Sequence, residues 1–265
     1  MSVSNTKFKD LPVRALTAFV LISLVLVCIF LGEFTSVVLL VVCSSVLLFE
    51  VISVSFRNKF SLNLSNMFAI LSFSIFPVFQ FFNIFPFSIL VLAGVTNILI
   101  FGWNFFRLFH ILYFGLSIFC FQKILFGDGT MISILGLKYI ICLVIASDIG
   151  GYIFGRLLAG PKLFPSISPK KTWAGALGGV LLAISIAPML ASKFQYSIFG
   201  IILITAILAV VSQVGDIFQS YFKRQFKVKD SGSILPGHGG LYDRLDGLLA
   251  VVPVYYFVSL YHTYF

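Results

Sequence analysis

Five of the nine acidic residues of this 265-residue chain lie in or beside two polar segments between long apolar runs. They are Asp148, Asp216, Asp230, Asp243 and Asp246. Lys, Arg, Ser and Thr side chains accompany them. Carboxylate oxygens are hard ligands for Mg²⁺, and Lys and Arg neutralise phosphate oxygens. This combination predicts a metal–polyphosphate site suited to phosphoryl or nucleotidyl transfer.

The positions of these acids favour function over topology. Asp216 and Asp148 lie at the ends of apolar runs, where a carboxylate is costly unless it is used. We predict that Asp216 and Asp243 are metal ligands that meet from the two ends of the 220–245 loop, because a divalent ion removes the repulsion between close carboxylates. Asp246 is either a third ligand or a partner that orients Arg244, and Asp148 is expected to face the same site.

Three other polar features have structural interpretations beside functional ones. Glu50 is embedded near the end of an apolar run, where pairing with Arg57 is the alternative to a functional role. His110 lies in an apolar helix and is predicted to be a satisfied interior residue. The Pro236–Gly240 segment predicts a sharp turn whose exposed backbone amides suit an anion.

Composition defines the elements that must position these residues. The chain has 60% hydrophobic and 10% charged residues and a mean hydropathy of +1.09, which excludes a water-soluble globular domain. Apolar runs of about 20 residues predict an all-α polytopic integral membrane protein. Gly178 and Gly179 are predicted to allow close packing of such helices. The nine predicted spans are 13–31, 34–55, 66–82, 85–102, 105–126, 131–155, 174–191, 197–219 and 246–264.

Nine spans occupy most of the chain, which predicts a single integral membrane domain over residues 1–265. Its N-terminal helices would cover 1–130, and 131–265 would form the catalytic half. We interpret the first apolar run as a retained span rather than a cleaved signal peptide. The four cysteines lie in apolar runs without a CxxC spacing, so neither a metal nor a redox role is expected for them.

The net charge of +9 is interpreted as a sign of orientation and of contact with anionic lipid, and no nucleic-acid partner is expected. Most Lys and Arg residues fall in alternate connecting segments if the N-terminus is cytoplasmic. The loops at 156–172 and 220–245 are then cytoplasmic and the C-terminus is outside. We expect the inner (cell) membrane of a bacterium.

The segment from Ser220 to Asp246 reads SYFKRQFKVKDSGSILPGHGGLYDRLD. At every fixed position and spacing it resembles the signature of the phosphatidate cytidylyltransferase (CDP-diacylglycerol synthase) family. Asp148-x-x-x-Tyr152, Ser168–Trp173 and Gly215-Asp216 resemble the other cytoplasmic motifs of that family, in the usual order. The resemblance runs from about residue 145 to the end. Ala174 stands where many members carry Glu, so no carboxylate can act from that position.

The resemblance implies a nucleotidyltransferase of phospholipid biosynthesis that joins CTP and phosphatidate to give CDP-diacylglycerol and pyrophosphate. It implies Mg²⁺ as cofactor and membrane lipids as surroundings, and leaves open a monovalent cation and a homodimer. The implied catalytic residues are Asp216, Asp243, Asp246, Lys223, Arg224, Asp230 and His238, with Asp216 and Asp243 as metal ligands. The implied substrate-binding residues are Asp148, Tyr152, Lys162, Ser168, Lys170, Lys171, Thr172, Ser220, Lys229, Gly239, Gly240 and Arg244.

The sequence leaves three alternatives to this function. A CTP-dependent polyprenol or phytol kinase, or transfer to another lipid phosphate, would use the same scaffold. A secondary transporter would require repeat symmetry and helices broken at the midplane, and neither is evident in the sequence. A non-catalytic membrane scaffold would leave the embedded acids unexplained.

Overall fold

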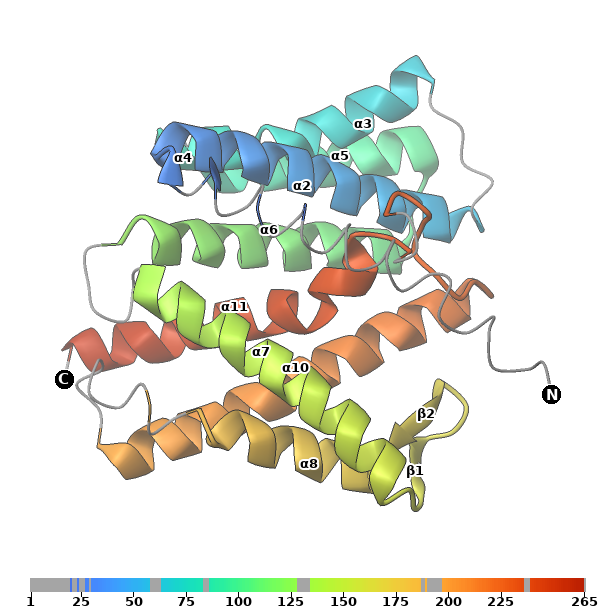
Figure 1. Ribbon diagram of the computed structural model, residues 1–265. Coiled ribbons are helices and arrows are strands. Elements are labelled where there is room, and N and C mark those ends of the chain that lie inside the picture. The colour runs from blue at the N-terminus through green and yellow to red at the C-terminus, as the bar shows by residue number, and fades with distance from the viewer. Residues whose placement is uncertain are drawn as a thin grey trace. The chain divides into compact units, whose positions relative to one another are not determined.

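Helices make up most of the chain, as the apolar runs predict (Figure 1). The computed structural model describes residues 30–57, 63–82, 86–127, 134–186, 197–235 and 239–264, together with residues 20, 23, 27, 28 and 189. The chain divides into two compact units. The first unit comprises residues 1–115 and 225–244, and the second comprises 116–224 and 245–265.

In the first unit, four helices pack on one another: α2 (Glu33–Ser55), α3 (Leu64–Ser74), α4 (Phe76–Phe81) and α5 (Pro86–Phe101). Apolar side chains of α2 such as Leu47, Leu48 and Ile52 are fully buried there. Hydroxyl pairs also join the helices, with Ser45 Oγ 2.7 Å from Ser74 Oγ and Ser72 Oγ 2.9 Å from Thr96 Oγ1. Such bonds keep polar groups satisfied between apolar helices. The helix α6 (Phe105–Leu125) begins in this unit.

The second unit contains the elements that carry the predicted loop at 156–172. The helix α7 (Ile134–Leu157) leads into an antiparallel hairpin of β1 (Lys162–Phe164) and β2 (Ser168–Thr172), which leads into α8 (Trp173–Ile184) (Figure 1). The long helix α10 (Ile198–Gln225) and most of α11 (Tyr242–Tyr264) belong to the same unit. The hairpin was not predicted, because its five-residue second strand, SPKKT, has no apolar alternation.

Five helices are long and apolar enough to cross a membrane: Glu33–Ser55, Leu64–Phe81, Phe105–Leu125, Ile134–Leu157 and Ile198–Gln225. They match five of the nine predicted spans. Most of the predicted span 13–31 lies outside the described residues. The helices at the predicted spans 85–102 and 174–191 have 16 and 12 residues, and α11, at 246–264, is not among the five. The count of nine and the side on which each loop lies stay predictions.

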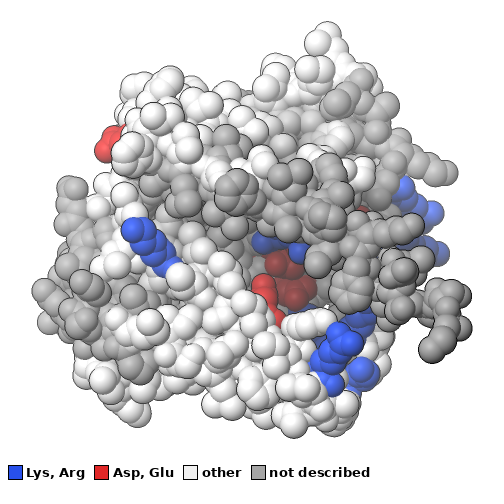
Figure 2. Space-filling model, in the orientation of Figure 1, with Lys and Arg blue, Asp and Glu red and all other residues white. Residues whose placement is uncertain are grey.

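The surface agrees with a membrane setting. Most of the described surface in Figure 2 carries neither acidic nor basic side chains. Exposed apolar residues include Phe30, Leu64 and Leu99, each more than three-quarters exposed. A water-soluble protein does not expose so much apolar surface. All four cysteines are free thiols.

Candidate active site

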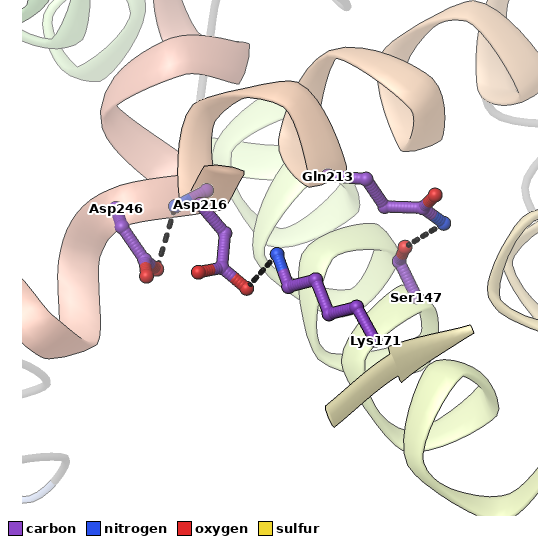
Figure 3. A network of polar contacts seen from close by, with 6 residues as sticks. Ser147, Lys171, Gln213, Asp216 and Asp246 are labelled. Atoms are coloured by element: carbon purple, nitrogen blue, oxygen red, sulfur yellow. Dashed lines mark hydrogen bonds and ion pairs between the residues drawn. The ribbon is translucent and has the colours of Figure 1, made fainter. Parts of the chain in front are cut away.

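Two carboxylates and an ammonium group meet within the second unit, each from a different element. Lys171 on β2 forms an ion pair with Asp216 on α10, with Nζ 2.5 Å from Oδ2. Asp246 on α11 lies beside Asp216 (Figure 3). Its Oδ1 accepts a hydrogen bond of 2.8 Å from the amide of Gly247. The Lys171 and Asp216 side chains are 26% and 35% exposed, so this pair lies at the protein surface.

A third acid adds negative charge to this group. Asp246 interacts electrostatically with Asp216, with Asp148 on α7 and with Lys171. Asp148 has an exposed side chain. We call Asp148, Asp216, Asp246 and Lys171 the carboxylate cluster. It combines three acids with one base, an arrangement that favours binding of a further cation.

Glycines allow the helices that carry the cluster to approach closely. A Cβ added at Gly150 of α7 would lie 2.6 Å from Gly178 O and 2.9 Å from Gly179 Cα, both on α8. A Cβ at Gly215, the neighbour of Asp216, would lie 2.9 Å from Asp246 O. Larger residues would force these backbones apart. The prediction that Gly178 and Gly179 serve close helix packing is confirmed.

Gln213 joins three helices one turn before Asp216. Its Nε2 donates to Ser147 Oγ on α7 at 3.3 Å (Figure 3). It also donates to Ala176 O on α8 at 3.0 Å. Ser147 precedes Asp148 in the chain and is 1% exposed. This bond therefore fixes the spacing of the helices that carry Asp148 and Asp216.

The hairpin positions Lys171. The register pairs Lys162 with Thr172 and Phe164 with Ser168. Thr172 ends the hairpin and begins α8, where its Oγ1 accepts the amide of Gly175 at 3.1 Å as a side-chain N-cap. Lys171 is thus held between a strand pair and a capped helix.

The basic end of α10 contacts the same hairpin region. Arg224 Nε donates to the carbonyl of Ile167 at 3.4 Å, and the Lys223 side chain is 8% exposed. Arg156 Nη1, at the end of α7, donates to Tyr152 Oη at 2.8 Å. The helices that carry acids of the cluster therefore also carry cations: Arg156 lies on α7, and Lys223 and Arg224 lie on α10.

Residues 225–244 of the Ser220–Asp246 signature, here called the signature loop, lie in the first unit, where two acids bind residues 231 and 240–242. Glu50 on α2 accepts from Ser231 Oγ, from the amide of Leu241 and from the amide of Tyr242, each at 2.8 Å. Asp243 Oδ2 accepts from the amides of Ser231 at 2.9 Å and Gly240 at 3.1 Å. We call Glu50, Ser231, Gly240–Tyr242 and Asp243 the loop neck.

The loop neck differs from one expectation for the Pro236–Gly240 turn, that its backbone amides are exposed. The amide of Gly240, predicted to be exposed to an anion, instead binds the protein's own Asp243. The amide of Gly239 donates to Leu235 O at 3.2 Å, and Gly239 has a φ of +85°, which favours glycine. The amides at the start of α11 are therefore satisfied by carboxylates of this chain.

His110 on α6 supports the loop neck from the same unit. Its Nδ1 lies 2.6 Å from Phe106 O, so Nδ1 carries the proton and Nε2 accepts from Tyr242 Oη at 3.0 Å. The ring is fully buried. The prediction that His110 is a satisfied interior residue is confirmed.

The remaining predicted site residues are distributed over both units. The side chains with high exposure are those of Tyr152, Lys162, Lys170, Arg224, Lys229, Asp230 and Arg244. Ser168 and Ser220 are half-buried, and Thr172 is 4% exposed. His238 lies outside the described residues. Asp243 belongs to the first unit and Asp216 to the second, so their predicted meeting stays a prediction.

Glu50, Gln213, Ser147 and Ser231 have roles that the sequence did not assign. The sequence singled out Glu50 as an embedded acid that requires partners, but it did not identify the loop donors that bind it. The spacing of Gln213 and Asp216, three residues apart on one helix, places both on one face. No local signal points to Ser231, whose partner Glu50 is 181 residues away.

The donor set of the carboxylate cluster fits Mg²⁺ chemically. No group of three or more His, Cys, Asp or Glu within the described ranges lies close enough to hold a metal ion. Mg²⁺ commonly uses one or two carboxylates, with waters and substrate phosphates as the other ligands. Asp216 and Asp246 side by side supply two such oxygen donors.

Comparison with known proteins gives a consistent result. The sequence profile described as the cytidylyltransferase family matches residues 12–262. A phosphatidate cytidylyltransferase of Brucella suis biovar 1 (strain 1330) is 40% identical over 156 residues, which are 58% of this chain and 56% of the relative. One of Staphylococcus haemolyticus (strain JCSC1435) is 46% identical over 124 residues, which are 45% of this chain and 48% of the relative. The matched region thus spans about half the length of these curated relatives.

Proposed function

The chain belongs to the cytidylyltransferase family, and we propose that it transfers the cytidylyl group of CTP to phosphatidate. The products are CDP-diacylglycerol and pyrophosphate. The names of the relatives at 40% and 46% identity support this acceptor. The observation that carries the proposal is the carboxylate cluster, in which Asp216 and Asp246 lie together beside Lys171.

The reaction requires positioning and charge neutralisation more than covalent chemistry. A phosphate oxygen of phosphatidate attacks the α-phosphorus of CTP. The bond between that phosphorus and the oxygen bridging to the β-phosphorus breaks, and pyrophosphate leaves. The protein must therefore hold two polyanions in line and stabilise the charge on the leaving group.

Asp216 and Asp246 are the proposed holders of Mg²⁺ in this site. The ion, when bound, would supply positive charge to the triphosphate through its oxygen atoms. Lys171, which pairs with Asp216, orients that carboxylate and neutralises charge beside it. Asp243 remains a predicted ligand, and its Oδ2 already binds two loop amides.

Basic side chains near the cluster are proposed to bind the phosphates. Lys170 and Lys171 lie on β2, and Lys223 and Arg224 end α10. The guanidinium of Arg224 presents a planar fork that suits phosphate oxygens better than an ammonium group does. Replacement by Lys keeps the charge and is expected to weaken CTP binding.

The chain has five helices able to cross a membrane, which supports an integral membrane enzyme. We place the loops at 156–172 and 220–245 on the cytoplasmic side of the inner membrane, where CTP is present. Single-cysteine labelling from each side of the membrane tests this placement. Labelling of both loops from the outside would contradict it.

The products distinguish the proposed reaction from its nearest alternative. Cytidylyl transfer releases pyrophosphate, whereas a CTP-dependent lipid kinase transfers the γ-phosphoryl group and releases CDP. We expect purified protein in detergent to release pyrophosphate when CTP, phosphatidate and Mg²⁺ are all present. Release of CDP with a polyprenol acceptor, and no pyrophosphate with phosphatidate, would assign the kinase reaction instead.

A further inference from the structure

The side chain of Glu50 is completely buried, which is unusual for an acid. Its side chain is 0% exposed, and it lies on α2, a helix apolar enough to cross a membrane. A buried carboxylate without hydrogen-bond donors costs several kcal/mol. Among the described residues, its donors come from the signature loop, 181 to 192 residues further along the chain. The acid therefore joins the N-terminal helices to that loop.

The hydrogen-bond geometry uses both oxygens of Glu50 as acceptors. Oε1 accepts the amide of Leu241, and Oε2 accepts Ser231 Oγ and the amide of Tyr242. A carboxylate fits three donors, whereas an amide side chain has one acceptor oxygen and one donor group. This arrangement is specific for an acid at position 50.

Close backbone approach confirms that the loop is fitted against this carboxylate. A Cβ added at Gly240 would lie 2.6 Å from both Glu50 oxygens and would also strike Ser231 Oγ. A Cβ at Gly232 would lie 3.3 Å from Glu50 Oε1. The loop backbone thus leaves no room for side chains on either side of the acid.

Two acids clamp the same two points of the loop. Asp243 binds the amides of Ser231 and Gly240, while Glu50 binds the hydroxyl of Ser231 and the next two amides. Because Asp243 forms part of the clamp, displacement of the neck would displace its carboxylate too. The neighbouring Arg244 would move with it.

We propose that Glu50 is a positioning residue for the reaction, acting through the loop neck. It does not contact substrate. It holds Ser231 and Gly240–Tyr242 in place, and so fixes the orientation of Asp243 and Arg244 at the start of α11. The kinetic part of this inference rests on the proposed function, whereas the structural part does not.

The informative variant is Glu50→Gln. The amide group would best place its oxygen at the Oε2 position, which leaves its NH₂ facing the amide of Leu241. One hydrogen bond to a charged acceptor is then lost, and two donors oppose each other. The matched control is Glu33→Gln, since Glu33 is an exposed acid in the first turn of the same helix. Ser231→Ala is a milder second variant that removes one donor and keeps the acid.

Hydrogen–deuterium exchange tests the structural part without any substrate. In Glu50→Gln, we expect the amides of peptide 231–242 to exchange about tenfold faster or more, with a smaller increase in Ser231→Ala. Glu33→Gln should match the wild type. Equal exchange in Glu50→Gln and Glu33→Gln would overturn the anchoring role.

Steady-state kinetics test the positioning role. We expect Glu50→Gln to raise KM for CTP and lower kcat/KM about tenfold or more in correctly inserted protein. Ser231→Ala should shift the same constants less. Faster exchange with unchanged kinetic constants would overturn the positioning role and leave a purely structural contact. If the wild type releases no pyrophosphate, the proposed function fails, while exchange still decides whether Glu50 anchors the loop.

Discussion

The carboxylate cluster and the loop neck both gather acids at the ends of apolar helices, yet the groups that contact these acids differ. In the loop neck, five hydrogen bonds from one short segment satisfy Glu50 and Asp243 Oδ2. In the carboxylate cluster, Asp216 pairs with one ammonium group and Asp246 accepts one adjacent amide. The oxygens of Asp216 and Asp246 thus accept fewer hydrogen bonds from the chain than those of Glu50 and Asp243.

This difference separates two uses of an embedded carboxylate. Where backbone amides converge on an acid, the acid shapes the chain and its capacity to bind further cations is low. Where acids converge on each other, a cation is needed and the site is suited to chemistry. The free-energy cost of burying an acid does not by itself distinguish these two uses. The number of hydrogen-bond donors around each carboxylate oxygen does distinguish them.

The largest expected effect is on the carboxylate cluster. Asp216→Asn and Asp246→Asn keep the side-chain size and remove one negative charge each. We expect either change to lower kcat by about 10²–10³-fold, because charge stabilisation of the transferring group is lost. Pyrophosphate release and the yield of folded protein are measured together, with Glu33→Gln as the matched control. Near wild-type turnover in both Asn variants would remove the chemical role of the cluster.

Two neighbouring lysines offer a sharper test of the same region. Successive strand residues point to opposite faces, and of the two, Lys171 pairs with Asp216. We expect Lys171→Gln to lower kcat/KM by about 10–10²-fold, and Lys170→Gln to have a smaller effect that falls mainly on KM for CTP. A larger loss in Lys170→Gln than in Lys171→Gln would contradict the geometry of the hairpin.

Adjacent glycines on α7 test the packing that positions Asp148. An added Cβ at Gly150 would lie 2.6 Å from Gly178 O, whereas at Gly151 the nearest atom is 3.7 Å away. Gly150→Ala should therefore lower the free energy of unfolding by about 1–3 kcal/mol. Gly151→Ala is the control and should change it little. Thermal unfolding in detergent measures both, and equal Tm values would show that the helices can separate without cost.

The smallest expected effect is at the loop neck. Tyr242→Phe removes the hydroxyl that donates to His110 Nε2. We expect the free energy of unfolding to fall by about 1 kcal/mol, with kcat changed less than about threefold. A double-mutant cycle with His110→Leu isolates this bond from other effects of each change. A coupling energy near zero would show that the bond does not contribute to stability.

The family could be predicted from the sequence because its signature is a local pattern. Asp216 and Asp246 stand out as acids beside apolar runs, and the Ser220–Asp246 signature identifies the family. The role of Glu50 could not be predicted, because its partners are 181 to 192 residues away and no periodicity links them. The sequence suggested a pairing of Glu50 with Arg57, whereas the Glu50 carboxylate binds the signature loop.

The positions of the helices could likewise be predicted better than their lengths. Hydropathy identified the apolar helices, since the apolar composition of a run is a local property. At the predicted span 174–191, the described helix α8 ends at Ile184 after 12 residues, about 18 Å of helix. The predicted span 66–82 corresponds to one apolar segment, Leu64–Phe81, within which α3 and α4 meet at Ile75 with Pro77 just beyond. Proline favours the first turn of a new helix.

The most direct test of the difference between the two acid sites is metal binding. Mn²⁺ can be followed by electron paramagnetic resonance as it binds to purified protein with saturating CTP. We expect Asp216→Asn to lose most of this binding and Glu50→Gln to retain most of it, because the Glu50 carboxylate is bound by donors of the loop neck. Retention of Mn²⁺ by Asp216→Asn, or an equal loss in Glu50→Gln, would contradict the assignment of cation binding to the carboxylate cluster.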